Sequence, residues 1–324
     1  MLLEVRDLAV DLPSPAGPLS VVRDVSFSLD AGGSLGVVGE SGSGKTMTAL
    51  ALMGLLPDGA RVSGAIWFEG RDLARLDEAE LQKLRGDRIA MIFQEPMTAL
   101  NPLHRIGAQV AEPLVLHRGM TKRAAWAEAV RLLDRVRLRD PERAARAYPF
   151  ALSGGERQRA MIAMALSCGP KLIIADEPTT ALDVTVQAKI LDLLATLSAQ
   201  TEMATLLVSH DLAVIARHCR RVLVMYGGAA MESGPVEAVL RRARHPYTRA
   251  LLEARPRPGA PRGERLRAIA GAASPAGEAP RGCPFAGRCP LTLDACRATP
   301  LPTLEFEADH RVRCLRVDAS GRLT

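Results

Sequence analysis

The sequence predicts an α/β fold built around a glycine-rich phosphate-binding loop. A short apolar strand at 35–38 leads into the loop at 39–46, and a helical run that ends at Pro57 follows the loop. Further apolar stretches lack polar alternation, which is typical of strands buried on both faces of a parallel sheet. These stretches lie at 172–176, 205–208 and 222–226. Strands of this kind, separated by helical segments, predict a parallel sheet with helices on its faces.

The N-terminal stretch and the middle of the chain differ from this core. Between residues 3 and 29 the alternation of apolar and polar residues favours half-buried strands, and so predicts an N-terminal antiparallel β region. Residues 61–70 read as another strand pair and residues 89–93 as a buried strand. From 106 to 137, apolar residues recur at steps of three and four, which predicts a helical insertion.

The composition is that of a globular protein. The chain has 324 residues, which allows about two domains, and 48% of them are hydrophobic. Aromatic residues make up only 3%, which disfavours a surface of stacked rings for single-stranded nucleic acid. The net charge of +6 is mild for this length, so we expect no nucleic-acid partner. Closeness to an anionic membrane surface would suit the same charge.

The first residues predict a cytoplasmic location. They carry charged side chains, among them Glu4, Arg6 and Asp7, so no apolar signal-peptide segment can form there. The charge-free stretch at 46–57 is shorter than the ~20 apolar residues of a membrane helix. We therefore expect any membrane association to depend on a partner.

The glycine-rich loop satisfies the pattern G-x-x-x-x-G-K-[ST] between a strand and a helix. Its glycines let successive backbone N–H groups converge on phosphate oxygens, and the helix N-terminus adds its positive end. Lys45 would reach the β- and γ-phosphates, and the Thr46 hydroxyl would coordinate Mg²⁺. The predicted phosphate-binding residues are Gly39, Glu40, Ser41, Gly42, Ser43, Gly44, Lys45 and Thr46.

Two adjacent carboxylates end the apolar strand that begins at Leu172. Asp176 can hold Mg²⁺ through its coordination shell, and Glu177 can accept a proton from an attacking water. Together with the loop, these carboxylates predict phosphoryl transfer from a nucleotide to water.

Four further motifs resemble those of ABC-transporter ATPase subunits, in the same order and at similar spacing. They are the signature motif LSGGERQR at 152–159, the Walker B and D-loop ADEPTTALD at 175–183, the switch-histidine motif VSHDL at 208–212, and the Q-loop glutamine Gln94. This resemblance implies a P-loop (RecA-like) ATPase core at 1–240, with the antiparallel β region and a helical subdomain at about 95–160.

Finer matches resemble the importer branch for oligopeptides, dipeptides and nickel. They are QEPMTALNP at 94–102, HPYTRALLEARP at 245–256 and RGCPFAGRCP at 281–290. They imply a C-terminal extension at 241–324, with a linker at 255–282 and a cysteine segment at 283–314. The implied function is ATP hydrolysis that powers a bacterial importer of di- or oligopeptides. The alternatives are an importer of nickel or another small solute, and a soluble ABC ATPase that acts on nucleic acid.

The resemblance also implies roles for single residues. Glu177 would be the general base, His210 would hold the γ-phosphate, and Gln94 would contact Mg²⁺ and the attacking water. The signature residues would contact the nucleotide bound by the opposite ATPase subunit, and the D-loop aspartate belongs to the same nucleotide site. These residues are Ser153, Gly154, Gly155 and Asp183.

The resemblance further implies a multi-subunit complex on the cytoplasmic face of the inner membrane. Its parts are two transmembrane permeases, a second and related ATPase chain that forms a heterodimer with this one, and a solute-binding protein. The sequence departs from the family in three places, one of which is the segment AIAGAASP at 268–275, where the family's usual proline is missing. Leu19 stands where an adenine-stacking aromatic residue is usual, and Glu95 stands where aspartate is usual.

The six cysteines fall into two groups. Cys168 and Cys219 lie in apolar surroundings and are expected to be inert core thiols. The other four have the spacing C-x5-C-x6-C-x17-C, which is wider than usual zinc spacing, and disulfides are disfavoured in the cytosol. The set favours a structural [4Fe–4S] cluster, with zinc and metal-free thiols as alternatives. These cysteines are Cys283, Cys289, Cys296 and Cys314.

Overall fold

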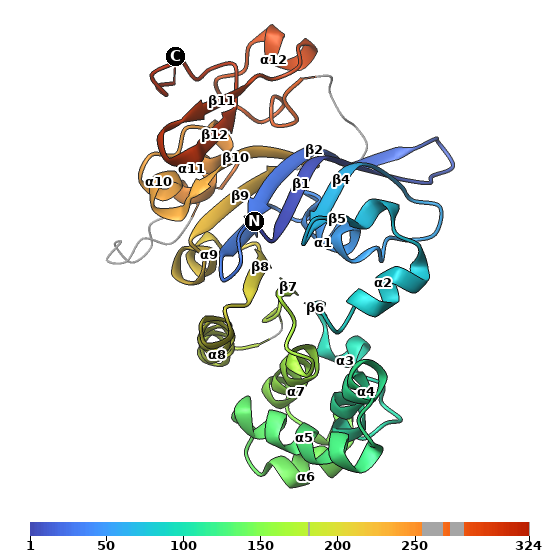
Figure 1. Ribbon diagram of the computed structural model, residues 1–324. Coiled ribbons are helices and arrows are strands. Elements are labelled where there is room, and N and C mark those ends of the chain that lie inside the picture. The colour runs from blue at the N-terminus through green and yellow to red at the C-terminus, as the bar shows by residue number, and fades with distance from the viewer. Residues whose placement is uncertain (181, 255–267, 273–281, 324) are drawn as a thin grey trace. The chain divides into compact units, whose positions relative to one another are not determined.

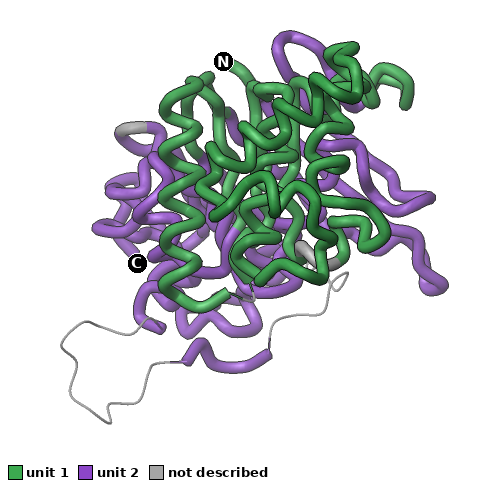
Figure 2. Tube along the Cα trace, turned by 90° about the horizontal axis from the view of Figure 1, so that it is seen from below, with its two compact units in different colours: residues 1–2, 29–34, 75–208 green, residues 3–28, 35–74, 209–324 purple. Residues whose placement is uncertain are grey.

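The computed structural model describes residues 1–180, 182–254, 268–272 and 282–323. They form two compact units that interleave along the chain (Figure 2). Unit 1 comprises residues 1–2, 29–34 and 75–208, and unit 2 comprises residues 3–28, 35–74 and 209–324.

Unit 1 contains a parallel sheet with the strand order β6-β7-β8. Ile89 pairs with Leu172 and Leu172 with Ala204, and every residue of these strands is buried. The strands are β6 (Ile89–Ile92), β7 (Leu172–Asp176) and β8 (Ala204–Ser209). Burial on both faces explains why their sequences are apolar without alternation, and the predicted strands at 89–93, 172–176 and 205–208 are confirmed.

The helices of unit 1 include a group, α3 to α7, that Figure 1 shows gathered together. Helix α5 packs against α4, and both pack on α7. Ala125, Ala129 and Leu133, at steps of four, form the buried stripe of α5. This confirms the helical insertion predicted over 106–137. The helices are α2 (Glu78–Leu84), α3 (Pro96–Ala99), α4 (Ile106–Arg118), α5 (Lys122–Arg135), α6 (Pro141–Arg146), α7 (Gly154–Leu166) and α8 (Val184–Thr201).

Unit 2 contains a mixed sheet with the strand order β5-β4-β1-β2-β10-β9-β3. Strands β1 and β4 are antiparallel, whereas β3 and β9 are parallel. The strands are β1 (Leu3–Leu12), β2 (Leu19–Leu29), β3 (Ser34–Val38), β4 (Arg61–Phe68), β5 (Arg71–Asp72), β9 (Arg221–Tyr226) and β10 (Ala229–Pro235). The predicted N-terminal antiparallel region and the strand at 222–226 are confirmed.

One strand prediction in unit 2 was wrong in detail. Residues 61–70 do not hold a strand pair, because β4 runs unbroken to Phe68 and its partner β5 lies beyond. Glu69 and Gly70 form the turn, with φ of 48° and 80°. Two positive φ angles in succession suit the tight turn of a hairpin.

The C-terminal part of unit 2 rejoins the sheet, because β12 pairs with β10 through Glu232 and Val312. Val312, Cys314 and Val317 form a small core there. The remaining elements are α1 (Lys45–Met53), α9 (Leu212–His218), α10 (Val236–Arg241), α11 (Pro246–Glu253), α12 (Asp294–Ala298), β11 (Thr303–Phe306) and β12 (His310–Arg313). Most of the linker predicted at 255–282 lies outside the described residues.

Within the described ranges, no helix combines the length and the apolar character that crossing a membrane requires. Helix α8 has 18 residues, and Lys189 and Asp192 interrupt its apolar sequence.

Candidate nucleotide site

The phosphate loop lies in unit 2 between β3 and α1, as predicted. Gly42 and Gly44 have φ of 76° and 96°, in the left-handed region that favours glycine. A Cβ on Gly44 would stand 2.6 Å from the backbone oxygen of Val21. Both positions therefore need glycine for conformation, and Gly44 also needs it for space.

Lys45 is the first residue of α1, and its side chain turns back onto the loop. The residue is only 5% exposed, and its Nζ donates to the backbone oxygens of Gly39 and Glu40 at 2.9 Å each. Ser43 is buried, and among the described residues its hydroxyl has no hydrogen-bond partner. A buried ammonium and an unpartnered hydroxyl in one glycine-rich loop fit a phosphate group.

His210 lies in the same unit, immediately after β8, and its side chain is exposed. The neighbouring residues hold the local turn, because the Asp211 N–H donates to Ser209 Oγ at 3.0 Å. The Asp211 carboxylate in turn accepts from the Ala213 N–H at 2.6 Å and caps α9. Ser209 and Asp211 thus fix the backbone on both sides of the predicted switch histidine.

Asp176 and Glu177 lie in unit 1 at the carboxyl end of β7. Asp176 is 2% exposed. Glu177 has φ of 43°, and its N–H donates to the backbone oxygen of Val208 at 3.0 Å. Its carboxylate accepts from Thr180 Oγ1 at 3.0 Å. The backbone of Glu177 and its carboxylate are therefore both held in place, as a residue that must orient a water requires.

The signature residues begin α7, also in unit 1. Ser153 and Glu156 form a capping box, in which Ser153 Oγ donates to the Glu156 carboxylate at 2.7 Å. Hydrogen bonds from Ser153 lower the pKa of Glu156. Gly154 is exposed and Gly155 half-buried. The cap therefore defines where the helix starts and leaves its first glycine accessible.

The other two predicted nucleotide residues of unit 1 have different settings. Gln94 follows β6 and is exposed. Asp183 is the N-cap of α8, and its carboxylate accepts from the Val186 N–H at 2.9 Å. The phosphate loop and His210 therefore belong to unit 2. Gln94, the signature residues, the two carboxylates and Asp183 belong to unit 1.

Two residues that sequence reasoning missed contact the phosphate loop from the C-terminal part of unit 2. Tyr247 Oη accepts from the Glu40 N–H at 3.0 Å, and the Arg288 guanidinium pairs with the Glu40 carboxylate. Both lie in segments that resemble the importer branch, at 245–256 and 281–290. The sequence offered no sign that these stretches reach the loop.

The two core thiols are confirmed. Cys168 and Cys219 are buried, and burial raises the pKa of Cys219 to about 12. A thiol with so high a pKa stays protonated and unreactive at neutral pH.

The four thiols of the cysteine segment gather without forming an evident metal site. Burial, together with the nearby thiols of Cys314, Cys289 and Cys296, raises the pKa of Cys283 to about 12, so these thiols lie close enough to Cys283 to interact with it. Nevertheless, no group of three or more His, Cys, Asp or Glu side chains in the described ranges could hold a metal ion. The arrangement therefore does not support the predicted cluster or zinc site.

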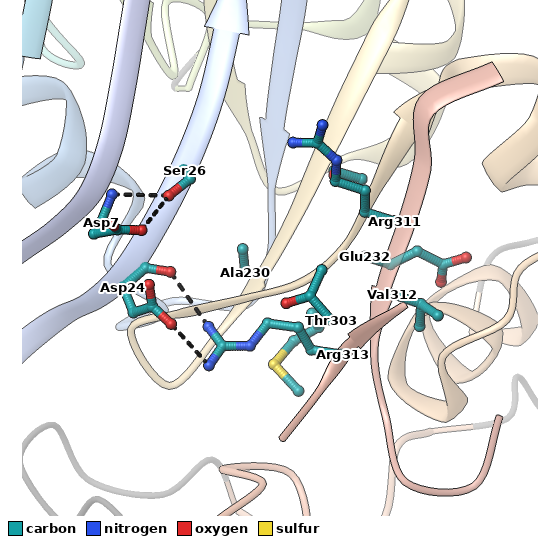
Figure 3. Close-up of a pocket in the computed structure, with 11 residues that line it drawn as sticks. Asp7, Asp24, Ser26, Ala230, Glu232, Thr303, Arg311, Val312 and Arg313 are labelled. Atoms are coloured by element: carbon teal, nitrogen blue, oxygen red, sulfur yellow. Dashed lines mark hydrogen bonds and ion pairs between the residues drawn. The ribbon is translucent and has the colours of Figure 1, made fainter. Parts of the chain in front are cut away.

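A separate pocket in unit 2 lies between the N-terminal strands and β12 (Figure 3). Its wall includes the ion pair between Arg313 and Asp24, with an N–O distance of 3.1 Å. Ser26 Oγ also donates to the Asp7 carboxylate there, at 3.0 Å. None of its described lining residues is predicted to bind nucleotide.

Two family models match separate parts of the chain. The ABC transporter family model matches residues 22–180, and the model for the C-terminal region of oligopeptide/dipeptide transporters matches residues 231–296. A solved structure of the dimeric ATP-binding cassette MJ0796, bound to ADP and Pi, superposes with a TM-score of 0.65 at 28% identity. It covers 72% of this chain and 99% of its own. The predicted ABC ATPase fold is confirmed.

Curated relatives match over almost the full length. The oligopeptide transport ATP-binding protein OppD of Escherichia coli is 49% identical, over 97% of this chain and 93% of the relative. OppD of Haemophilus influenzae is 48% identical, over 92% of each chain. These matches cover nearly the whole chain and not the ATP-binding part alone. The chain therefore belongs to the family of ABC transporter ATPases that serve oligopeptide/dipeptide importers.

Proposed function

We propose that this ATPase powers the import of di- or oligopeptides. The observation that carries the proposal is the near-full-length similarity to OppD relatives, which includes the oligopeptide/dipeptide C-terminal region at 231–296. An ATPase domain alone would not separate a peptide importer from other ABC transporters, whereas this extension does. Import of nickel or another small solute is the alternative within the family.

The roles of the site residues follow from their chemistry. The phosphate loop holds the nucleotide through its backbone N–H groups and Lys45. Thr46 and Asp176 would supply oxygen ligands for Mg²⁺, which would neutralise charge on the phosphates. Glu177 takes a proton from the attacking water, with its carboxylate oriented by Thr180.

The remaining predicted site residues act around this centre. Gln94 would contact Mg²⁺ and the attacking water, and His210 would hold the γ-phosphate. The signature residues Ser153, Gly154 and Gly155, together with Asp183, act on the nucleotide of a second ATPase chain. Each of them lies at the start of a helix or within two residues of the end of a strand, where backbone N–H groups or side chains are available to a ligand.

We further propose that residues 1–240 form the ATPase domain and residues 241–324 the importer-type extension. The complex would contain two permeases, a related ATPase chain and a solute-binding protein, with this chain on the cytoplasmic face of the membrane. Three apolar side chains of the helical subdomain at about 95–160 are available for a protein contact, because Leu103, Leu116 and Phe150 are 81%, 71% and 68% exposed.

The test is transport by the reconstituted complex. The chain, purified with two permeases, the second ATPase chain and the solute-binding protein of its complex, is placed in vesicles that contain ATP, and uptake of a labelled tripeptide and of nickel is measured. We expect uptake of the tripeptide to depend on ATP. This uptake should be lost when the Glu177→Gln variant is used in place of the wild-type chain. Uptake of nickel without uptake of any peptide would establish the alternative.

We also propose that the four thiols of the cysteine segment hold a [4Fe–4S] cluster. The donor set supports it: three of the four cysteines are buried, their thiols interact, and cysteine thiolates are the usual ligands of such clusters. When bound, the cluster would tie together a segment with a small core. Anaerobic purification followed by iron and sulfide analysis tests this, and background levels of both elements would refute it.

A further inference from the structure

An ion pair joins the cysteine segment to the phosphate loop. Arg288 lies between Cys283 and Cys296. Its guanidinium donates two hydrogen bonds, of 2.6 and 3.2 Å, to the two oxygens of the Glu40 carboxylate. Glu40 is the second residue of the phosphate loop, and its backbone oxygen accepts from Lys45 Nζ at 2.9 Å. The contact spans 248 residues of sequence and lies wholly within unit 2.

The geometry of Arg288 is unlike that of a surface arginine. Its side chain is only 8% exposed, against 26% for Glu40. Besides Glu40, it donates to Tyr226 Oη at 3.2 Å and to the backbone oxygens of Ala270 and Ile269 at 2.8 and 3.2 Å. Every branch of the guanidinium therefore has an acceptor, and the group is held in one orientation.

An aromatic cluster supports the same contact. Phe285 is 1% exposed and packs edge-on against Tyr226, with 5.2 Å between ring centroids. It also packs against Tyr247 at 5.2 Å, and Tyr247 Oη accepts from the Glu40 N–H. The Glu40 backbone is therefore held by Tyr247 of α11, against which Phe285 packs, and the Glu40 carboxylate is held by Arg288.

The charge of Glu40 makes this contact functionally important. A carboxylate in a loop that binds a triphosphate repels the ligand unless a cation compensates it. Arg288 supplies that cation and draws the carboxylate toward the cysteine segment. Lys45 cannot do so, because it is the residue that must meet the phosphates.

We propose that Arg288 is a positioning residue for ATP binding: it neutralises Glu40 and fixes the phosphate loop in its binding conformation. The inference rests on the proposed role of this loop in holding the nucleotide. It gives the C-terminal extension a direct part in nucleotide affinity.

The test uses steady-state ATPase kinetics of the purified full chain. Arg288→Gln should raise KM for ATP about tenfold and leave kcat within about twofold, because the loop binds phosphates before and during the reaction alike. Adding Glu40→Gln removes the uncompensated charge, so the double variant should recover most of the affinity. Arg288→Lys, which keeps the charge without the paired hydrogen bonds, should fall between Arg288→Gln and the wild type.

Arg313→Gln is the matched control. Arg313 also ties the C-terminal part to the N-terminal strands, through Asp24 (Figure 3), but it contacts no residue of the phosphate loop. Its KM for ATP should stay that of the wild type.

Two outcomes would overturn the proposal: an unchanged KM in Arg288→Gln, or a double variant no better than the single one. The second would show that Arg288 acts only on folding, which thermal unfolding of the same samples would report. Lys45→Ala separates this failure from that of the proposed function. If Lys45→Ala still binds ATP, the loop itself does not hold the nucleotide.

Discussion

The phosphate loop and the cysteine segment are both recognised by short motifs, but they are built in opposite ways. The loop at 39–46 takes its shape from consecutive residues, through glycines in the left-handed region and a lysine that bonds to its own loop. The cysteine segment at 283–314 draws three of its thiols from loops and the fourth, that of Cys296, from helix α12, and it depends on distant packing. A local motif therefore forms its binding site from its own consecutive residues, whereas the positions of dispersed ligands depend on how the surrounding fold packs.

The sharpest difference should appear in stability. Phe285→Ala removes a ring buried against Tyr226 and Tyr247, and should lower the free energy of unfolding by about 4 kcal/mol. Urea unfolding monitored by tyrosine fluorescence measures this. Phe150→Ala is the control, because that ring is 68% exposed and its loss should cost little. Equal losses in the two variants would mean that the aromatic cluster does not hold the cysteine segment.

A change in the phosphate loop should instead weaken the binding of ATP. Lys45→Ala removes the buried ammonium and should weaken ATP binding about 100-fold, because charged hydrogen bonds to phosphate are lost. Equilibrium binding of a fluorescent ATP analogue measures the change. Lys83→Ala, at an exposed position of α2, should bind as the wild type does. If Lys45→Ala bound ATP as tightly as the wild type, the phosphate loop would not hold the nucleotide through Lys45, and this side of the comparison would be wrong.

Acid should destabilise the extension through His245. Burial lowers the pKa of His245 to about 4, so the unfolded chain binds a proton there that the folded chain does not. Stability is therefore lost as the pH falls below the unfolded pKa near 6.5, by about 2 kcal/mol between pH 7 and pH 5.

His245→Asn isolates this effect. Asparagine can still accept from the Tyr247 N–H that His245 Nδ1 caps at 3.0 Å, but it does not titrate in this range. Thermal unfolding at both pH values should show a smaller acid loss in the variant. An identical pH dependence in the two proteins would assign it to other groups.

The smallest effect concerns the signature helix of unit 1. Ser153→Ala removes the cap of α7 and should cost about 1 kcal/mol of stability. Thr121→Ala removes the similar cap of α5 and should cost about as much. ATPase activity separates the two, because only Ser153 has a proposed role at the nucleotide. If both variants keep full activity, Ser153 is a structural cap alone.

Local chemistry explains what could be predicted from the sequence. The buried strands, the helical insertion and the phosphate loop each depend on residues close together in the chain, and the structure confirms them. The strand pair expected within 61–70 was displaced, because the turn uses Glu69 and Gly70 rather than an earlier position.

Long-range contacts explain what could not be predicted. Nothing in the sequence around Glu40 indicates that Arg288 and Tyr247 contact it, because a pair separated by more than 200 residues leaves no local pattern. The arrangement of the four thiols could not be predicted for a similar reason. The spacing of four cysteines gives the donor set, but the positions of their thiols depend on how β12 and the loops around α12 pack.

ATP turnover by Glu177→Gln tests the central claim most directly. Glu177 is held at the end of β7 by Thr180 and the backbone of Val208, in the setting of a general base. The variant should bind ATP as tightly as the wild type, while turnover falls about 1,000-fold, because only proton transfer from water is lost. Hydrolysis at a substantial fraction of the wild-type rate would contradict the account.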